Sequence, residues 1–319
     1  MTDRFSLSAA GVQVVLEAST GRLPAVLHWG ADLGPLDDSS FDALELAAAQ
    51  TTMVNGPDIP TRLAIIPEGW TGWVGHPGLS GSRAGRDWSP RFTVASIDVD
   101  GDVDHRGGVA NIGAATVVFH ASDEITRLGL DVIVEMLDAG ILRVRAIVTN
   151  LASELYQVDQ LLVALPVPSR AREVLDFSGR WAKERVPQRR TLGVGTHWRE
   201  ARHGRTGPDS AYVLHLGTPG FGFADGEIWA THTAWSGNHV HYAERVLTSD
   251  QVIGGGELLL PGEIVLAEQE SYASPWVYAN YATGLDAVAR RFHTYLRARP
   301  QHPDAARPVT LNVWEAVYF

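Results

Sequence analysis

The sequence of 319 residues contains no cysteine. A disulfide framework and a thiolate metal site are both excluded by that absence. No run of apolar residues approaches the length of ~18 that a membrane-spanning helix needs. The first five residues, Met-Thr-Asp-Arg-Phe, lack the basic and apolar segments of a signal peptide. We therefore expect a cytoplasmic protein with no membrane partner.

Positive charge is also scarce. Lysine and arginine together number 26 against 37 acidic residues, which gives a formal net charge of -11 at pH 7. A nucleic-acid-binding domain favours a basic stripe on its surface, and this composition argues against one. We expect no nucleic-acid partner.

Familiar catalytic and cofactor motifs are missing too. The sequence contains no Gly-x-Ser-x-Gly elbow and no His-Glu-x-x-His zinc motif. The glycine-rich stretch 217–222 contains Pro219 within a β pattern, which predicts a turn and not a phosphate-binding loop before a helix. His239 and His241 would share one face of a strand, so a metal site is conceivable, but no nearby carboxylate spacing supports it. We expect no cofactor and no metal.

Patterns typical of β-strands fill most of the chain. Apolar residues alternate over 128–136, Asp138-Ala139-Gly140 turns the chain, and alternation resumes over 142–148. Asp225-Gly226 predicts a second hairpin, between strands at 221–223 and 228–230. Strands at this spacing indicate an all-β fold with two large sheets, and not βαβ units.

Two segments have helical patterns. Phe41 to Ala49 is rich in alanine and follows candidate capping residues. Apolar residues from Leu285 to Leu296 fall at helical spacing, and Pro300 ends that pattern. Between the first helix and the main β region, 51–91 is rich in loops and contains Trp70, Trp73 and Trp88. These indoles either bind a ligand or close the sandwich, and the sequence leaves both open.

The segment 176–185 concentrates charge around Trp181. Runs of this kind are most often structural ion-pair clusters. The alternative is a polar loop in which Trp181 stacks on the flat face of a sugar.

The last residues, 307–319, are apolar and β-branched after Pro308, which predicts a buried strand. Because no partner strand follows, we expect the chain to be the front part of a longer protein. We divide it into a β domain at 1–282, a helix and linker at 283–306, and the first strand of a further domain at 307–319.

Several motifs in the second half resemble glycoside hydrolase family 36, the bacterial α-galactosidases. The resemblance covers some 140 residues and ends at the chain terminus. The motifs that carry it are Gly179-Arg180-Trp181-Ala182-Lys183-Glu184-Arg185, Gly204-Arg205-Thr206, Trp235-Ser236-Gly237-Asn238, Leu259-Leu260-Pro261-Gly262-Glu263, Ser274-Pro275-Trp276-Val277-Tyr278 and Arg307 to Phe319.

The resemblance implies a β-supersandwich, a connecting helix and the first strand of a (β/α)8 barrel. It also implies hydrolysis of terminal α-galactosyl residues, with retention, from oligosaccharides of the melibiose or raffinose type. The nucleophile and the acid/base aspartate would lie beyond Phe319, so the chain contains no catalytic residue and should be inactive alone.

Three residues are candidates for contact with the sugar. The resemblance places Trp314 against bound galactose and Trp181 near the same pocket. Asp58, in the Asn-Gly-Pro-Asp loop, is the candidate for an acidic residue supplied by a neighbouring subunit, since the family implies a homo-oligomer. The alternatives are a carbohydrate-binding module without catalysis and a purely structural oligomerisation domain.

Overall fold

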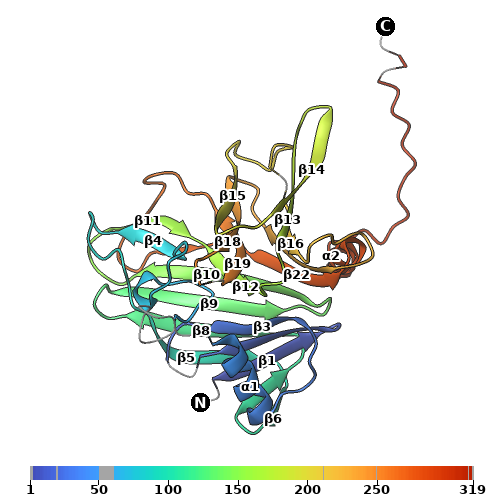
Figure 1. The fold of residues 1–319 in the computed structure, drawn as a ribbon. Coiled ribbons are helices and arrows are strands. Elements are labelled where there is room, and N and C mark those ends of the chain that lie inside the picture. Colours follow the sequence, from blue (N-terminus) through green and yellow to red (C-terminus); the bar gives the residue numbers. More distant parts are fainter. Residues whose placement is uncertain are drawn as a thin grey trace.

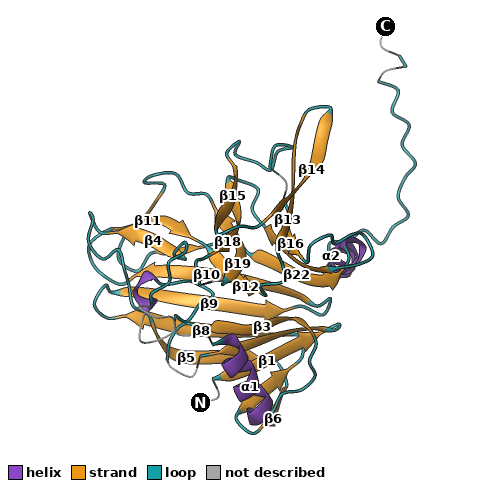
Figure 2. Ribbon diagram, in the orientation of Figure 1, coloured by secondary structure: helices purple, strands orange, loops and turns teal. Residues whose placement is uncertain are grey.

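The structure is a computed structural model that describes residues 3–18, 21–49, 61–210, 212–248, 250–314 and 316–317. Figure 1 shows a body built from β-sheets, with a helix at one side and the C-terminal segment leading away from it. Helices are few, as Figure 2 makes plain. The all-β prediction, with a helix after the sheets, is confirmed.

One layer is a ten-stranded sheet. Nine of its strands follow the order β14-β13-β16-β17-β22-β10-β9-β8-β5. The tenth, β21, pairs with the C-terminal part of β10, at residues 147–149. Their bounds are β5 Thr93–Asp100, β8 Ala115–Asp123, β9 Leu128–Met136, β10 Ile141–Asn150, β13 Glu173–Arg180, β14 Lys183–Thr191, β16 Leu214–Gly217, β17 Glu227–Thr233, β21 Ser271–Ala273 and β22 Val277–Thr283.

Three smaller sheets form the other layer. Their orders are β3-β2-β1-β7-β6, β20-β11-β4 and β12-β19-β18-β15. Their bounds are β1 Arg4–Ala9, β2 Val12–Glu17, β3 Ala25–Ala31, β4 Leu79–Ser82, β6 Val103–Arg106, β7 Val109–Ile112, β11 Tyr156–Leu161, β12 Val163–Val167, β15 Gly195–Ala201, β18 His239–Arg245, β19 Gln251–Glu257 and β20 Ile264–Leu266. One continuous apolar core, which includes Leu7, Leu130 and Ile253, lies between the layers.

The β9–β10 hairpin forms as its alternating sequence predicts. Leu142 pairs with Met136 and Asn150 with Leu128, so the register is regular over the whole hairpin. Gly140 closes the turn at a φ of 71°, a conformation that favours glycine. Apolar side chains of both strands point into the core because residues two apart on a strand share a face.

Both predicted helices are present. Helix α1 spans Asp38–Ala48, and the carboxylate of Asp37 caps it by accepting a hydrogen bond from the Ser40 backbone N–H at 2.8 Å. Helix α2 spans Leu285–Ala298 and packs on β22, where the Asn280 side chain donates to the Val288 carbonyl at 2.8 Å. A one-turn 3-10 helix covers Gly69–Thr71. Neither α1 nor α2 is long and apolar enough to cross a membrane.

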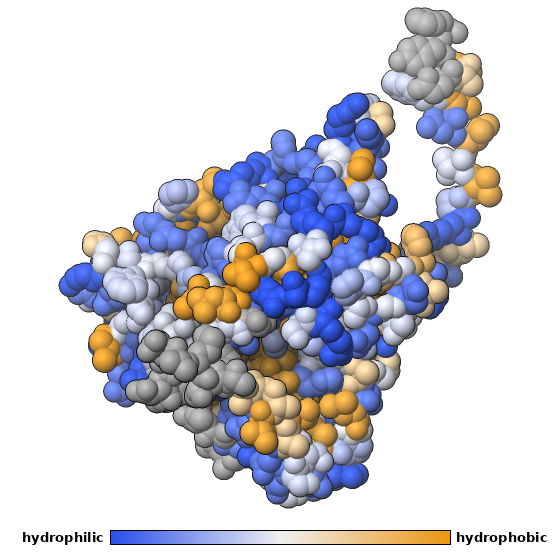
Figure 3. Space-filling view, viewed as in Figure 1, coloured by the Kyte–Doolittle hydropathy of each residue, from blue (hydrophilic) through white to orange (hydrophobic). Residues whose placement is uncertain are grey.

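One predicted strand is wrong, and a second has no partner strand within the described residues. Residues 221–223 form a turn, since the Gly222 N–H bonds to the Asp225 carbonyl and β17 pairs with Leu214–Gly217 instead. Residues 307–314 belong to no strand; Val309 and Leu311 are 102% and 82% exposed. A strand needs a hydrogen-bonded neighbour, and this segment leads away from every sheet of the described chain (Figures 1 and 3).

The tryptophans of the long loop have separate environments. Trp73 is buried beneath the loop, as expected for an indole that closes the sandwich. The guanidinium groups of Arg22 and Arg91 each lie over the ring of Trp70. Trp88 is 70% exposed.

Candidate functional site

The β13–β14 hairpin carries Trp181 and projects from the body of the domain (Figure 1). Arg180 pairs with Lys183, so Trp181 and Ala182 form a two-residue loop, with Ala182 at a φ of 61°. The indole of Trp181 is 86% exposed at the tip. A large aromatic face presented to solvent at the tip of a hairpin suits stacking on a flat ligand.

The charges of this hairpin are mostly of one sign. Lys183, Arg185 and Arg190 are exposed along β14, and Glu184 is the single acidic residue between 177 and 191. Among the residues described, no salt bridge joins Glu184 to these basic side chains; it accepts instead from the backbone N–H of Ala182 at 2.9 Å. The prediction of an ion-pair cluster within 176–185 is therefore wrong, because Asp176 alone in that run forms salt bridges, and to another strand.

Asp176 lies at the base of the hairpin and is buried between the layers. Its Oδ2 accepts from His197 Nε2 at 2.9 Å and lies 3.3 Å from Arg199 Nε, both on β15. Burial by itself raises the pKa of Asp176, but the hydrogen bond from His197 and the charge of Arg199 outweigh it and hold that pKa below its ordinary value. The ionised carboxylate thus ties the hairpin to the second layer.

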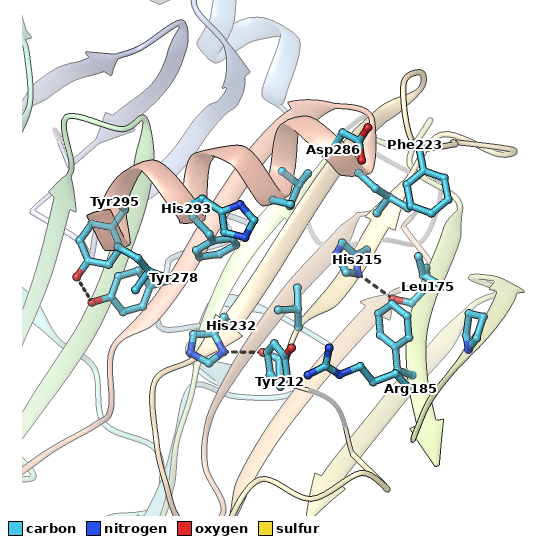
Figure 4. Close-up of a pocket in the computed structure, with 18 of the residues that line it drawn as sticks. Leu175, Arg185, Tyr212, His215, Phe223, His232, Tyr278, Asp286, His293 and Tyr295 are labelled. Carbon is cyan, nitrogen blue, oxygen red and sulfur yellow. Dashed lines mark hydrogen bonds between the residues drawn. The ribbon is translucent and has the colours of Figure 1, made fainter. Parts of the chain in front are cut away.

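A groove of about 980 Å³ opens between α2 and the β13–β14 hairpin (Figure 4). One face of α2 forms one wall, β13 and β14 form the other, and β16, β17 and β22 form the floor. Most of the lining is apolar or aromatic, including Phe177, Val213 and Phe292. Shape and composition are those of a site that binds another surface or a ligand.

Two histidines lie on the floor of this groove. His215 Nδ1 donates to the Leu175 carbonyl at 3.3 Å, and His232 Nδ1 donates to the Tyr212 carbonyl at 2.6 Å (Figure 4). Burial lowers the pKa of His215 to about 4 and lowers that of His232 as well. Both rings are neutral at pH 7, and each keeps Nε2 as a hydrogen-bond acceptor.

Sequence reasoning did not single out this groove. Its histidines interrupt apolar strands, at Leu214-His215-Leu216 and within Ala230-Thr231-His232. A histidine within an apolar strand is the feature of the sequence that could have indicated the groove. The sheet order β16-β17-β22 brings the two histidines beside α2, and no local sequence pattern predicts that order.

His239 and His241 share a strand face, as their spacing predicts. Both are buried, with ring centroids 5.2 Å apart. His241 Nε2 accepts from the Thr233 backbone N–H at 3.0 Å, and burial lowers the pKa of His241 well below its ordinary value. Across the described ranges, no cluster of three or more His, Asp or Glu side chains is arranged to hold a metal ion.

Two of the three predicted sugar contacts, Trp314 and Trp181, lie outside the groove. Trp314 is 68% exposed on the extended C-terminal segment, and Trp181 is at the hairpin tip; neither lines the groove. Asp58 lies outside the described residues. The hairpin and the C-terminal segment both project beyond the body of the domain (Figure 1).

Comparison with known families identifies what the chain is similar to. Residues 22–267 match the family model described as "Glycosyl hydrolase family 36 N-terminal domain". The chain belongs to glycosyl hydrolase family 36. Residues 271–319 match a second family model, described as "Melibiase". The boundary between the two matches falls just before β21.

Individual members of family 36 resemble the chain closely. An "Alpha-galactosidase" of Escherichia coli is 35% identical over 298 residues, which cover 92% of this chain and 40% of that protein. The structure of the α-galactosidase AgaA of Geobacillus stearothermophilus in complex with raffinose superimposes with a TM-score of 0.84 at 18% identity, covering 99% of this chain and 46% of AgaA. The α-galactosidase of Lactobacillus brevis gives a TM-score of 0.85 at 20% identity, with 99% and 45% covered.

The chain therefore spans less than half the length of these family 36 relatives. The groove lies at the junction of the two family matches. Strands β13, β14, β16 and β17 fall within the N-terminal match, whereas β22 and α2 fall within the melibiase match.

Proposed function

We propose that this chain is the N-terminal part of a retaining α-galactosidase. The whole enzyme would hydrolyse terminal α-D-galactosyl residues of oligosaccharides such as melibiose and raffinose. The observation that carries the proposal is the 35% identity to the Escherichia coli "Alpha-galactosidase" over nearly the whole chain. The relative solved in complex with raffinose supports the class of substrate.

In this proposal residues 1–282 form the β domain, 283–306 connect it to the barrel, and 307–319 begin the barrel. The match of 271–319 to "Melibiase" supports a second domain that starts near α2. Retention requires two carboxyl groups about 5–5.5 Å apart across the glycosidic bond. We place both beyond Phe319, so the 319-residue chain supplies no catalytic residue.

Trp314, Trp181 and Asp58 remain the proposed substrate contacts. Active sites of (β/α)8 barrels gather at the C-terminal ends of the strands, where Trp314 would lie on the first strand. The exposure of the Trp181 indole at the tip of a projecting hairpin supports a role in recognition. Asp58 would reach the site of a neighbouring subunit in a homo-oligomer. We place the enzyme in the cytoplasm.

Sugar binding by the isolated chain separates this proposal from its alternatives. Trp181→Ala should leave stability within about 0.5 kcal/mol of wild type, since the side chain is exposed. Measurable galactose affinity of the 319-residue chain by calorimetry, lost in Trp181→Ala, would favour a carbohydrate-binding module. A mass above monomer by sedimentation, with no sugar affinity and no α-galactosidase activity of the complete protein, would favour a purely structural oligomerisation domain.

A further inference from the structure

The β13–β14 hairpin is fastened to the second layer at its base. The side chain of Asp176 is buried, and its Oδ2 contacts both His197 and Arg199 of β15. Arg199 extends this connection, because its Nη2 donates to the Phe177 carbonyl at 3.4 Å and to the Asp209 carbonyl at 2.7 Å. One guanidinium thus joins β13, β15 and the loop that follows β15. We call Asp176, His197 and Arg199 the hairpin anchor.

Beyond the anchor, the hairpin has few contacts with the rest of the domain. Every residue from 180 to 185 is exposed, and the hairpin projects from the body (Figure 1). Among the described residues, the hydrogen bonds of 180–184 stay within the hairpin. Arg180 donates to the Trp181 carbonyl, and the Ala182 N–H donates to Glu184. The position of the Trp181 indole is therefore determined mainly at the base.

A small change at the base becomes a large displacement at the tip. Trp181 follows Asp176 by five residues, which corresponds to about 17 Å of extended strand. A tilt of about 10° at the base would then displace the indole by about 3 Å. Misplacement of a substrate-positioning group by ~1 Å can already be costly. A hairpin that contributes to a sugar site therefore needs a base of defined orientation.

Stability alone would not favour the hairpin anchor. Burial removes both members of an ion pair from water, and replacing such a pair by apolar residues is often neutral or stabilising. Asp176 also leaves its Oδ1 without a hydrogen-bond partner among the described residues, although buried acceptors are normally satisfied. The best-attested role of buried polar and ionic groups is to specify the register of packed elements. That role suits a contact at the point where the hairpin leaves the body.

We propose that Asp176, His197 and Arg199 are positioning residues that orient the Trp181 indole for contact with the substrate. The inference rests on the proposed function, in which Trp181 is a substrate contact. The three side chains do not touch the substrate themselves and act through the orientation of the hairpin. Loss of the anchor should therefore raise KM and leave kcat nearly unchanged, because the chemical step belongs to groups beyond Phe319.

Two variants of the complete protein disrupt the anchor in different ways. Asp176→Asn keeps the shape of the side chain and removes its charge, whereas Arg199→Met keeps the apolar stem and removes the guanidinium. Glu173→Gln is the matched control, since Glu173 also lies on β13 but pairs with Arg189 within the hairpin and not across the layers. Each variant is made alone and together with Trp181→Ala, and KM and kcat are measured with an aryl α-galactoside.

The kinetic effect should depend on Trp181. Both anchor variants should raise KM at least about fivefold, with kcat within about twofold of wild type. Glu173→Gln should leave KM within about twofold of wild type. In the Trp181→Ala background, the anchor variants should change KM by less than about twofold, because the residue through which they act is already removed. A general loss of structure would not depend on Trp181 in this way.

Amide hydrogen exchange gives a readout that needs no activity. It is followed by mass spectrometry in the 319-residue chain. Peptides that cover 173–191 should exchange at least about threefold faster in Asp176→Asn and Arg199→Met than in wild type. Peptides that cover β9 and β10 should exchange at the same rate in all three proteins, which shows that the variants fold.

The outcomes separate the inference from the proposed function. An active protein in which the anchor variants leave KM unchanged, or raise it equally with and without Trp181, would overturn the inference and leave the function standing. The same KM increase in Glu173→Gln would also overturn it, as would unchanged exchange over 173–191. A complete wild-type protein without activity on α-galactosides would overturn the proposed function and, with it, the role of the anchor towards substrate.

Discussion

The buried imidazole of His215 should make the stability of the domain depend on pH. The pKa of His215 is about 4 in the folded chain and returns to its ordinary value near 6.5 on unfolding. The folded state therefore disfavours protonation of the His215 imidazole, and the contribution of His215 to the free energy of unfolding is fully present above pH 6.5. It is lost as the pH falls from 6.5 towards 4, where the folded state also takes up the proton.

The size of this effect follows from the pKa difference. Each unit corresponds to about 1.4 kcal/mol, so the full loss is about 3 kcal/mol. About 2 kcal/mol of this loss falls between pH 7 and pH 5. Other groups also titrate in this range, so the informative quantity is the difference between wild type and a variant without this imidazole.

His215→Leu removes the titrating group and keeps an apolar side chain in the groove. It also removes the donor to the Leu175 carbonyl, a cost of about 1 kcal/mol that does not depend on pH. The free energy of unfolding is measured by urea denaturation at pH 7 and pH 5 for both proteins. Wild type should lose about 2 kcal/mol more than His215→Leu over that interval. His105→Leu, at an exposed position on β6, controls for the loss of a histidine as such.

Equal losses in wild type and His215→Leu would show that burial does not lower the pKa of His215 in the folded chain. A direct check is the titration of the His215 ring by NMR in the folded chain. A midpoint near 6.5 would contradict the burial argument, whatever the denaturation curves show.

Two further predictions concern the core between the layers. Leu130→Ala, at a position 1% exposed on β9, should lower the free energy of unfolding by about 2–5 kcal/mol in guanidinium titrations; a loss below about 1 kcal/mol would mean that this core is not close-packed. A Cβ at Gly254 would collide with the Val163 carbonyl oxygen, so Gly254→Ala should lower the free energy of unfolding by at least about 1–3 kcal/mol. Gly113→Ala, at a position with open space around it, serves as the control. Equal melting temperatures for the two glycine variants would show that β12 and β19 are not as close as described.

Local sequence patterns correctly predicted the elements whose structure depends only on their own residues. The alternation from Leu128 to Val148, with Gly140 between, determines both strands and the turn of β9–β10. The helical spacing from Leu285 to Leu296, with Pro300 after it, determines α2. The same patterns indicated two layers of sheet, because strands at that spacing must bury one face each.

Patterns failed where a residue depends on a partner that is distant in sequence. Asp225-Gly226 marks a turn correctly, but it does not reveal that β17 pairs with Leu214–Gly217. Asp176 lies among basic residues of its own segment, yet its charge is balanced by Arg199 and by a hydrogen bond from His197 on another sheet. Val309 to Val317 has the composition of a strand, but composition supplies no hydrogen-bonding neighbour. The groove was missed for the same reason, since its walls come from β13–β14 and α2.

We propose that the complete protein is an α-galactosidase of which this chain is the N-terminal part. The most direct measurement is the release of nitrophenol from an aryl α-galactoside by the product of the complete reading frame, beside the 319-residue chain and a buffer blank. We predict hydrolysis by the complete protein, with the α-anomer of galactose as the first product by NMR, and no release by the 319-residue chain above the blank. Hydrolysis by the 319-residue chain alone, or none by the complete protein, would rule out this assignment of the activity.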